Sequence, residues 1–232
     1  MLLFAHRGAS AHARANTIEA YTLAVEHGAD GIELDVRRTR DGALVLSHEE
    51  RAEPELPPFV DLDFKEIRES MPWVPTLDEA WATLGPDTLL NIELKNRPDE
   101  VDHDPTHRLA ASVAEWLELK GDTEHVILSS FNHETLAAAK RLVPGVRSGV
   151  LVMPGTDPYP TITDALANGH ATVNIWVQTA LSDGRDIVDA AGDVDVLVFT
   201  VNDPDQAVQL REAGIAGIFT DDPRMMREAL SA

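Results

Sequence analysis

One segment near the start of the chain alternates polar and apolar residues with period two, which predicts a strand with two different faces. In Gly31–Val36, Glu33 and Asp35 share one face and the apolar residues share the other. A half-exposed antiparallel strand with acidic side chains in water would give the same pattern. This segment alone therefore does not show whether the two carboxylates face solvent or a shared polar interior.

A second segment repeats the pattern. Leu89–Leu94 and the following Lys95 place Glu93 and Lys95 on one side and apolar residues on the other. Two strands of this kind favour a shared polar interior over two separate solvent-facing strands.

The rest of the chain alternates short apolar runs with segments of helical periodicity that begin at capping residues and end at glycine. We predict strands at Leu2–Ala5, Gly31–Val36, Ala43–Ser47, Leu89–Leu94, Val126–Ser130, Ser148–Val152, Thr172–Val177, Asp195–Val201 and Gly217–Asp221. We predict helices from a cap at Asn16 to Gly28, at Asp61–Ser70, Thr76–Gly85, Thr106–Lys120, Asn132–Leu142, Thr161–Asn168, Asp186–Ala191, Asp203–Gly214 and Pro223–Leu230.

About eight strand–helix units within about 250 residues are typical of a (β/α)8 TIM barrel. An open doubly wound sheet would need fewer units and a glycine-rich turn after the first strand. In this chain Gly8 is the single glycine of that turn. We therefore predict an α/β fold with a single TIM-barrel domain over residues 1–232. Active sites of such barrels lie at the carboxyl ends of the strands, where several charged residues of this chain fall.

Composition narrows the classes of function. The 232 residues are 44% hydrophobic and include no cysteine, which excludes disulfides and thiolate metal sites. A formal net charge of −21 argues against binding nucleic acid or anionic membranes, so we expect neither partner. No leader or long apolar segment is evident, and we expect a soluble cytoplasmic chain with no stable membrane association.

Three acidic residues at the predicted strand ends suggest a metal site. Glu33, Asp35 and Glu93 offer only oxygen ligands, which suit Mg²⁺ or Ca²⁺, with Mn²⁺ as a further candidate, better than Zn²⁺. For Glu93 the alternative is an ion pair with Lys95 or Arg7.

Cations and histidines beside these acids suggest phosphate chemistry. Arg7 and Lys95, which we expect at a solvated barrel mouth, can bind phosphoryl oxygens. His6 and His48 have the proton-transfer chemistry that phosphodiester cleavage requires. We expect the other seven histidines at the surface.

Taken together, these motifs resemble the glycerophosphodiester phosphodiesterase family along nearly the whole chain. The segments that carry the resemblance are His6-Arg7-Gly8, Asn16-Thr17, Gly31-x-Glu33-x-Asp35-Val36, Thr39-x-Asp41-Gly42, His48, Pro75-Thr76-Leu77, Glu93-Leu94-Lys95, Thr200-Val201-Asn202-Asp203 and Gly217-Ile218-x-Thr220-Asp221-x-Pro223.

The resemblance implies a TIM-barrel enzyme that uses one divalent cation to hydrolyse glycerophosphodiesters to glycerol phosphate and an alcohol. It also implies roles by motif position: Glu33, Asp35 and Glu93 as metal ligands, Arg7 and Lys95 as phosphate ligands, His48 as general acid, and His6 as nucleophile or base.

The chain departs from the family pattern in four places. Ala15 stands where a glutamate is usual, Glu49 where an aspartate is usual, and Phe199 where a tryptophan is common. The Leu-x-Arg-Thr stretch expected after His48 is absent, and Arg51-Ala52-Glu53-Pro54 occupies that region. Trp176 is then the nearby aromatic candidate for contacting substrate, although a core position would suit it equally.

Two alternative functions stay open. A related barrel phosphodiesterase could act on lysophospholipids or phosphoinositides, but the loop Met153–Pro160 offers only Met153 and Tyr159 for a membrane interface. A non-catalytic phosphate-binding barrel could use Arg7 and Lys95 but would have no use for two histidines.

Overall fold

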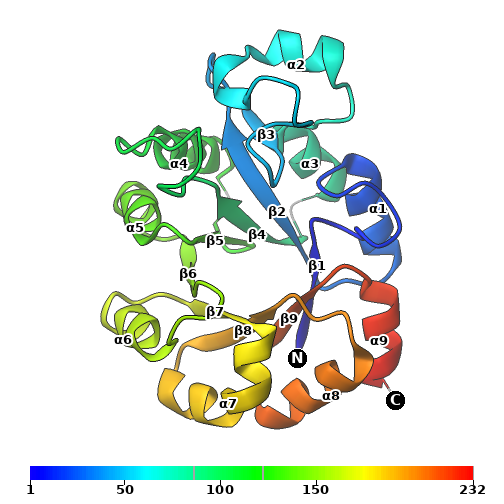
Figure 1. Ribbon diagram of the computed structural model, residues 1–232, viewed down its shortest axis with the longest axis vertical. Coiled ribbons are helices and arrows are strands. Elements are labelled where there is room, and N and C mark those ends of the chain that lie inside the picture. The colour runs from blue at the N-terminus through cyan, green and yellow to red at the C-terminus, as the bar shows by residue number, and fades with distance from the viewer. Residues whose placement is uncertain (86, 122, 232) are drawn as a thin grey trace.

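Eight parallel strands form a closed ring in the computed structural model, which describes residues 1–85, 87–121 and 123–231 (Figure 1). The predicted TIM barrel is therefore confirmed. Around the ring the strands are β1 (Leu2–His6), β2 (Gly31–Arg38), β4 (Leu89–Leu94), β5 (Val126–Ser130), β6 (Arg147–Leu151), β7 (Thr172–Trp176), β8 (Asp195–Phe199) and β9 (Gly217–Thr220), and β9 pairs back onto β1.

Helices surround the ring, because the outward apolar residues of parallel strands must be covered on that side as well. They are α1 (Ile18–Glu26), α3 (Leu77–Leu84), α4 (Arg108–Lys120), α5 (His133–Leu142), α6 (Tyr159–Ala167), α7 (Val177–Ala191), α8 (Pro204–Ala213) and α9 (Pro223–Ser231). No helix in the described part of the chain is long and apolar enough to cross a membrane.

The predicted strand at Ala43–Ser47 lies outside the ring. It forms β3 (Leu44–Leu46), which pairs antiparallel with the end of β2. After it come a short 3-10 helix, Phe59–Asp61, and α2 (Phe64–Ser70), where the sequence predicted one helix. Val45, Phe59, Ile67, Met71 and Val74 form a small separate core under this segment.

The starts of α1 and α7 differ from the prediction in ways that the structure explains. Thr17, not Asn16, caps α1: its hydroxyl accepts a hydrogen bond from the amide of Ala20. Asn16 has a φ of 56° and turns its side chain towards β2. Helix α7 begins at Val177 and not at Asp186, with non-helical backbone at Asp183, because its buried residues extend over both halves.

Candidate active site

Strand register brings the predicted site residues together at the carboxyl end of the barrel. His6 on β1 pairs with Glu33 on β2, and Asp35 two residues further along β2 pairs with Glu93 on β4. Residues at matched positions of neighbouring parallel strands face the same side of the sheet. Residues far apart in sequence therefore form one cluster.

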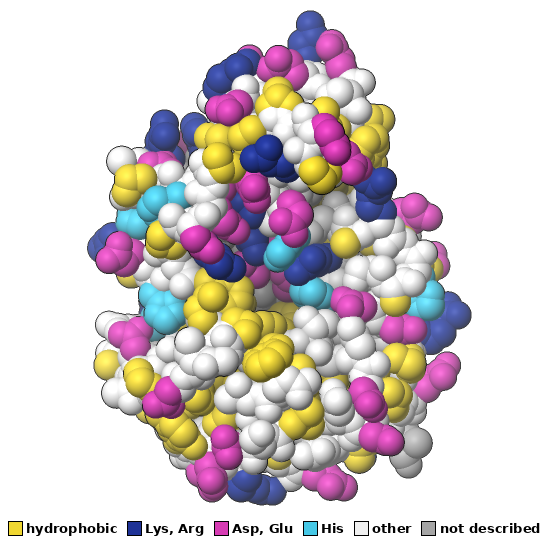
Figure 2. Space-filling view, viewed as in Figure 1, with side chains coloured by type: hydrophobic (Ala, Val, Ile, Leu, Met, Phe, Trp, Pro, Cys, Tyr) yellow, Lys and Arg dark blue, Asp and Glu magenta, His cyan; other side chains and the backbone are white. Residues whose placement is uncertain are grey.

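The cluster opens into a cavity of about 350 Å³. Figure 2 shows a hollow with histidines and charged side chains gathered on one side and hydrophobic side chains on the other. The lining residues are His6, Arg7, Glu33, His48, Asn91, Glu93, Arg97, Phe131, Leu151, Met153, Pro154, Asn174, Phe199, Thr200 and Phe219.

The three carboxylates fit a divalent cation. One oxygen from each of Glu33, Asp35 and Glu93 lies within 4.8 Å of the others, and all three residues are buried. Burial raises the pKa of Glu33 well above its ordinary value, and Asp35 and Glu93 raise it further. Among the described residues, Asp35 Oδ1 has no hydrogen-bond partner, and Lys95 Nζ lies 3.4 Å from it. A bound cation would relieve both of these costs.

The two predicted phosphate ligands occupy different environments. Arg7 lines the cavity, and its Nε lies 3.3 Å from Asp35 Oδ2. Lys95 is only 5% exposed and does not line the cavity. Its Nζ lies 2.8 Å from Glu93 Oε1 and 3.4 Å from Asp35 Oδ1. The expectation of a solvated mouth is therefore wrong for Lys95, because β4 turns this side chain among the acids.

We expect Lys95→Ala to destabilise the fold by about 3 to 5 kcal/mol, because it removes the buried cation between Glu93 and Asp35 and leaves Asp35 paired with Arg7 alone. Urea unfolding with EDTA present measures this loss. Lys65→Ala, at an exposed residue whose Nζ lies 3.8 Å from Glu69, is the matched control. A midpoint for Lys95→Ala within error of the control would contradict the buried-pair interpretation.

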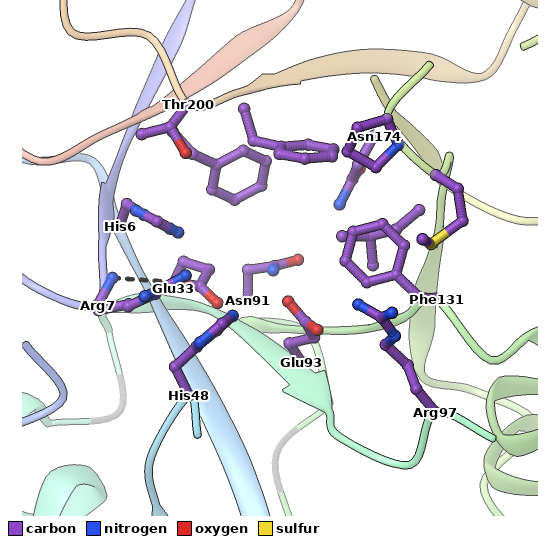
Figure 3. Close-up of a pocket in the computed structure, with 15 residues that line it drawn as sticks. His6, Arg7, Glu33, His48, Asn91, Glu93, Arg97, Phe131, Asn174 and Thr200 are labelled. Atoms are coloured by element: carbon purple, nitrogen blue, oxygen red, sulfur yellow. Dashed lines mark hydrogen bonds between the residues drawn. The ribbon is translucent and has the colours of Figure 1, made fainter. Parts of the chain in front are cut away.

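Each predicted catalytic histidine is held by a carboxylate. Nδ1 of His6 lies 2.7 Å from Asp221 Oδ1, and Nδ1 of His48 lies 2.7 Å from Glu49 Oε1. In Figure 3 both rings point into the cavity, with Glu33 between them. Because the carboxylate accepts a hydrogen bond from Nδ1–H, each Nε2 is left to face a ligand.

The pKa values of His48 and of Asp221, the partner of His6, are both shifted by their surroundings. Burial lowers the pKa of His48 below its ordinary value, and Asp35 offsets this only in part. Burial would raise the pKa of Asp221, but hydrogen bonds from His6, Asn202 and Ser10 hold it at about 2. Asp221 is therefore ionised at any ordinary working pH and fixes the orientation of the His6 ring.

Several supporting residues were not predicted from the sequence. Asn16 donates a hydrogen bond to Asp35 Oδ2 at 2.7 Å. Arg37, fully buried and paired with Glu100 and Asp102, donates to the backbone oxygen of His48. Asn16 and Asp221 belong to motifs noted in the sequence, but Arg37 had no such signal because its partners lie more than sixty residues away.

Aromatic and aliphatic residues form the other side of the cavity. Phe131 and Phe199 contact each other edge to face, with centroids 5.9 Å apart. The structure does not bring Trp176 into this cavity; it packs against the main hydrophobic core. Not all of the remaining histidines lie at the surface either, because His27 and His170 are each only 7% exposed.

Comparison with known proteins agrees with this geometry. The glycerophosphoryl diester phosphodiesterase family matches residues 6–225. An uncharacterised Bacillus subtilis protein, YqiK, is 36% identical over 95% of both chains. A glycerophosphodiester phosphodiesterase of Caldanaerobacter subterraneus is 30% identical over 97% of this chain and 96% of that protein.

Solved structures give the same result. A glycerophosphodiester phosphodiesterase from Thermotoga maritima has a TM-score of 0.80 at 25% identity, covering 98% of this chain and 97% of that one. An Oleispira antarctica phosphodiesterase in complex with the product sn-glycerol-3-phosphate has a TM-score of 0.83 at 25% identity, covering 100% and 97%. With the family match over nearly its whole length and a barrel whose carboxyl end gathers these residues, the chain belongs to the glycerophosphoryl diester phosphodiesterase family.

Proposed function

We propose that this chain hydrolyses glycerophosphodiesters to glycerol phosphate and an alcohol, using a divalent cation at Glu33, Asp35 and Glu93. One observation carries the proposal: two carboxylate-held histidines line a single cavity together with Glu33 and Glu93, two members of the cluster of three carboxylates. A phosphate-binding protein without catalysis would not need the two histidines.

Glu33, Asp35 and Glu93 would hold Mg²⁺ or Ca²⁺, with Mn²⁺ as an alternative, and the bound ion would supply positive charge to the phosphoryl oxygens. Arg7 would bind a further phosphoryl oxygen, because its guanidinium lies in the cavity wall. Lys95 would act indirectly: it balances the charge of Asp35 and Glu93 from the buried side.

His6 and His48 would divide the proton transfers. We assign His6 as the nucleophile or base from its position in the family motif. Ionised Asp221 supports this role because it holds the proton on Nδ1 and leaves Nε2 with a lone pair. We assign His48 as the acid that protonates the leaving alkoxide. Its lowered pKa makes protonated His48 a stronger acid but a smaller fraction of the enzyme at neutral pH.

Asp221→Asn should lower kcat with little change in KM, because the His6 ring loses the charge that fixes its tautomer and orientation. The loss should not exceed the roughly 10²- to 10⁴-fold effect of a catalytic histidine. Initial rates over a range of pH test this, since a residue with a merely structural role would change stability and leave the shape of the pH profile intact.

Asp203→Asn is the matched control for that experiment. Asp203 caps α8 from outside the site, and asparagine caps helices equally well. Equal loss of kcat in both variants would rule out a specific contribution from Asp221.

The apolar side of the cavity gives a specific reason to test lysophospholipids as a second substrate class. Leu151, Met153 and Phe199 could contact an acyl chain. Two rates distinguish the substrate classes. One is the release of glycerol phosphate from glycerophosphocholine, and the other is the release of acylated glycerol phosphate from the matching lysophospholipid. Preference for the deacylated substrate supports the proposal, and preference for the lysophospholipid overturns it in favour of the second class.

A further inference from the structure

A second group of potential metal ligands lies outside the carboxylate cluster. It consists of His12, His27 and Asp222, and one ligand atom from each lies within 4.8 Å of the others. Among the residues that the structure describes, these are the histidines and acid that gather in this way without belonging to the catalytic cavity. We call the group the histidine cluster.

Three separate segments build the histidine cluster. His12 lies in the turn after β1, His27 is the C-terminal cap of α1, and Asp222 follows β9. The barrel brings these segments together because β1 pairs with β9, and the amide of Ala11 donates a hydrogen bond to the backbone oxygen of Asp221. The group is thus held by the barrel itself.

The hydrogen bonding leaves ligand capacity unused. His27 is 7% exposed, and its Nδ1 is buried with no hydrogen-bond partner in the part of the chain that the structure describes. An unpartnered buried polar atom costs about 1 to 3 kcal/mol unless something satisfies it. Burial lowers the pKa of His27, which favours the neutral imidazole that a metal ion binds.

The other two members are oriented for the same purpose. Asp222 Oδ1 caps α9 by accepting from the amide of Met225, which leaves Oδ2 2.9 Å from Nε2 of His12. The side chains of His12 and Asp222 are 40% and 19% exposed, so an ion can reach the group from solvent. His12 also contacts His27 edge to face, with ring centroids 5.2 Å apart.

From this geometry we infer that His12, His27 and Asp222 form a second metal site, which takes Zn²⁺ or a similar transition-metal ion. Two imidazoles and one carboxylate are ligands that zinc accepts, with solvent at a fourth position. Glu33, Asp35 and Glu93 offer oxygen alone and suit Mg²⁺ or Ca²⁺. The two sites should therefore prefer different kinds of ion. The inference does not depend on the proposed catalytic activity.

Zinc binding to the full chain, measured by isothermal titration calorimetry with excess Mg²⁺ present, tests the inference. Glu33→Gln is the working background, because it weakens ion binding at the catalytic cluster. We expect the Glu33→Gln protein to bind zinc. Adding His12→Ala or Asp222→Asn to it should reduce the zinc affinity at least tenfold. The asparagine keeps the cap of α9, so a loss is not caused by unfolding. His103→Ala, at a half-buried histidine between β4 and α4, should bind as the background does.

Co²⁺ provides an independent spectroscopic readout. Visible absorption typical of four- or five-coordinate Co²⁺ should form in the Glu33→Gln background and vanish when His12→Ala or Asp222→Asn is added. Circular dichroism of the metal-free variants confirms that they are folded. Absence of zinc binding in the background, or binding that both substitutions leave unchanged, would overturn the second metal site.

Discussion

His48→Ala should lose most of its activity on glycerophosphodiesters but keep appreciable activity on a nitrophenyl phosphodiester, whereas His6→Ala should fail on both. Glycerol or a head-group alcohol leaves as a strongly basic alkoxide and needs a proton, a contribution of roughly 10²- to 10⁴-fold. Nitrophenolate leaves without that help. The ratio of kcat/KM for the two substrates in each variant is the measurement.

The pH dependence provides an internal check on these roles. A general acid must be protonated, so activity on the glycerol substrate should decline at alkaline pH, while activity on the nitrophenyl substrate should not. His103→Ala, at a histidine outside the cavity, is the control. Equal losses on both substrates in His48→Ala would remove the general-acid assignment, and the reverse pattern would exchange the two roles.

Glu33→Gln, Asp35→Asn and Glu93→Gln should each abolish most metal-dependent turnover, because each removes one of the three charges proposed to hold the ion. The ion should also stabilise the fold. An ion at about 100 times its dissociation constant adds about 2.7 kcal/mol when it binds only the native state. Thermal melting with and without Mg²⁺ measures this, and each variant should lose the shift.

Glu33 allows a sharper test, because its raised pKa means that ionising it costs stability in the ion-free protein. Without an ion, the folded state binds more protons than the unfolded state above the ordinary glutamate pKa, so stability should fall as pH rises there. Glu33→Gln should remove this fall. Glu55→Gln, at an exposed residue outside the cluster, should behave as wild type.

Ordinary metal-dependent turnover in Glu33→Gln, Asp35→Asn and Glu93→Gln alike would place the ion at another site.

The barrel was predictable because its signal is repetitive. Each strand–helix unit has its own apolar run and its own capping or terminating residues. An error in one helix, such as the late start predicted for α7, therefore leaves the number of units unchanged. The Asp41-Gly42 turn is typical of a hairpin and agrees with the antiparallel pairing of β3 with β2.

The site was predictable where its residues lie at or just after the ends of predicted strands. Register places His6 beside Glu33 and Asp35 beside Glu93, and Arg7 and His48 follow the ends of β1 and β3. Arg37 and Lys95 show the limit: one supports His48 through partners distant in sequence, and the other is buried among acids. Neither burial nor long-range pairing can be read from a local pattern.

Release of glycerol phosphate from glycerophosphodiesters, before and after removal of metal with EDTA, tests the central claim most directly. The proposal predicts release by the untreated enzyme, loss of release in EDTA, and recovery when Mg²⁺, Ca²⁺ or Mn²⁺ is restored in excess. Release that persists undiminished in EDTA would contradict a metal-dependent site at Glu33, Asp35 and Glu93. Absence of release with every restored ion would contradict glycerophosphodiester hydrolysis itself.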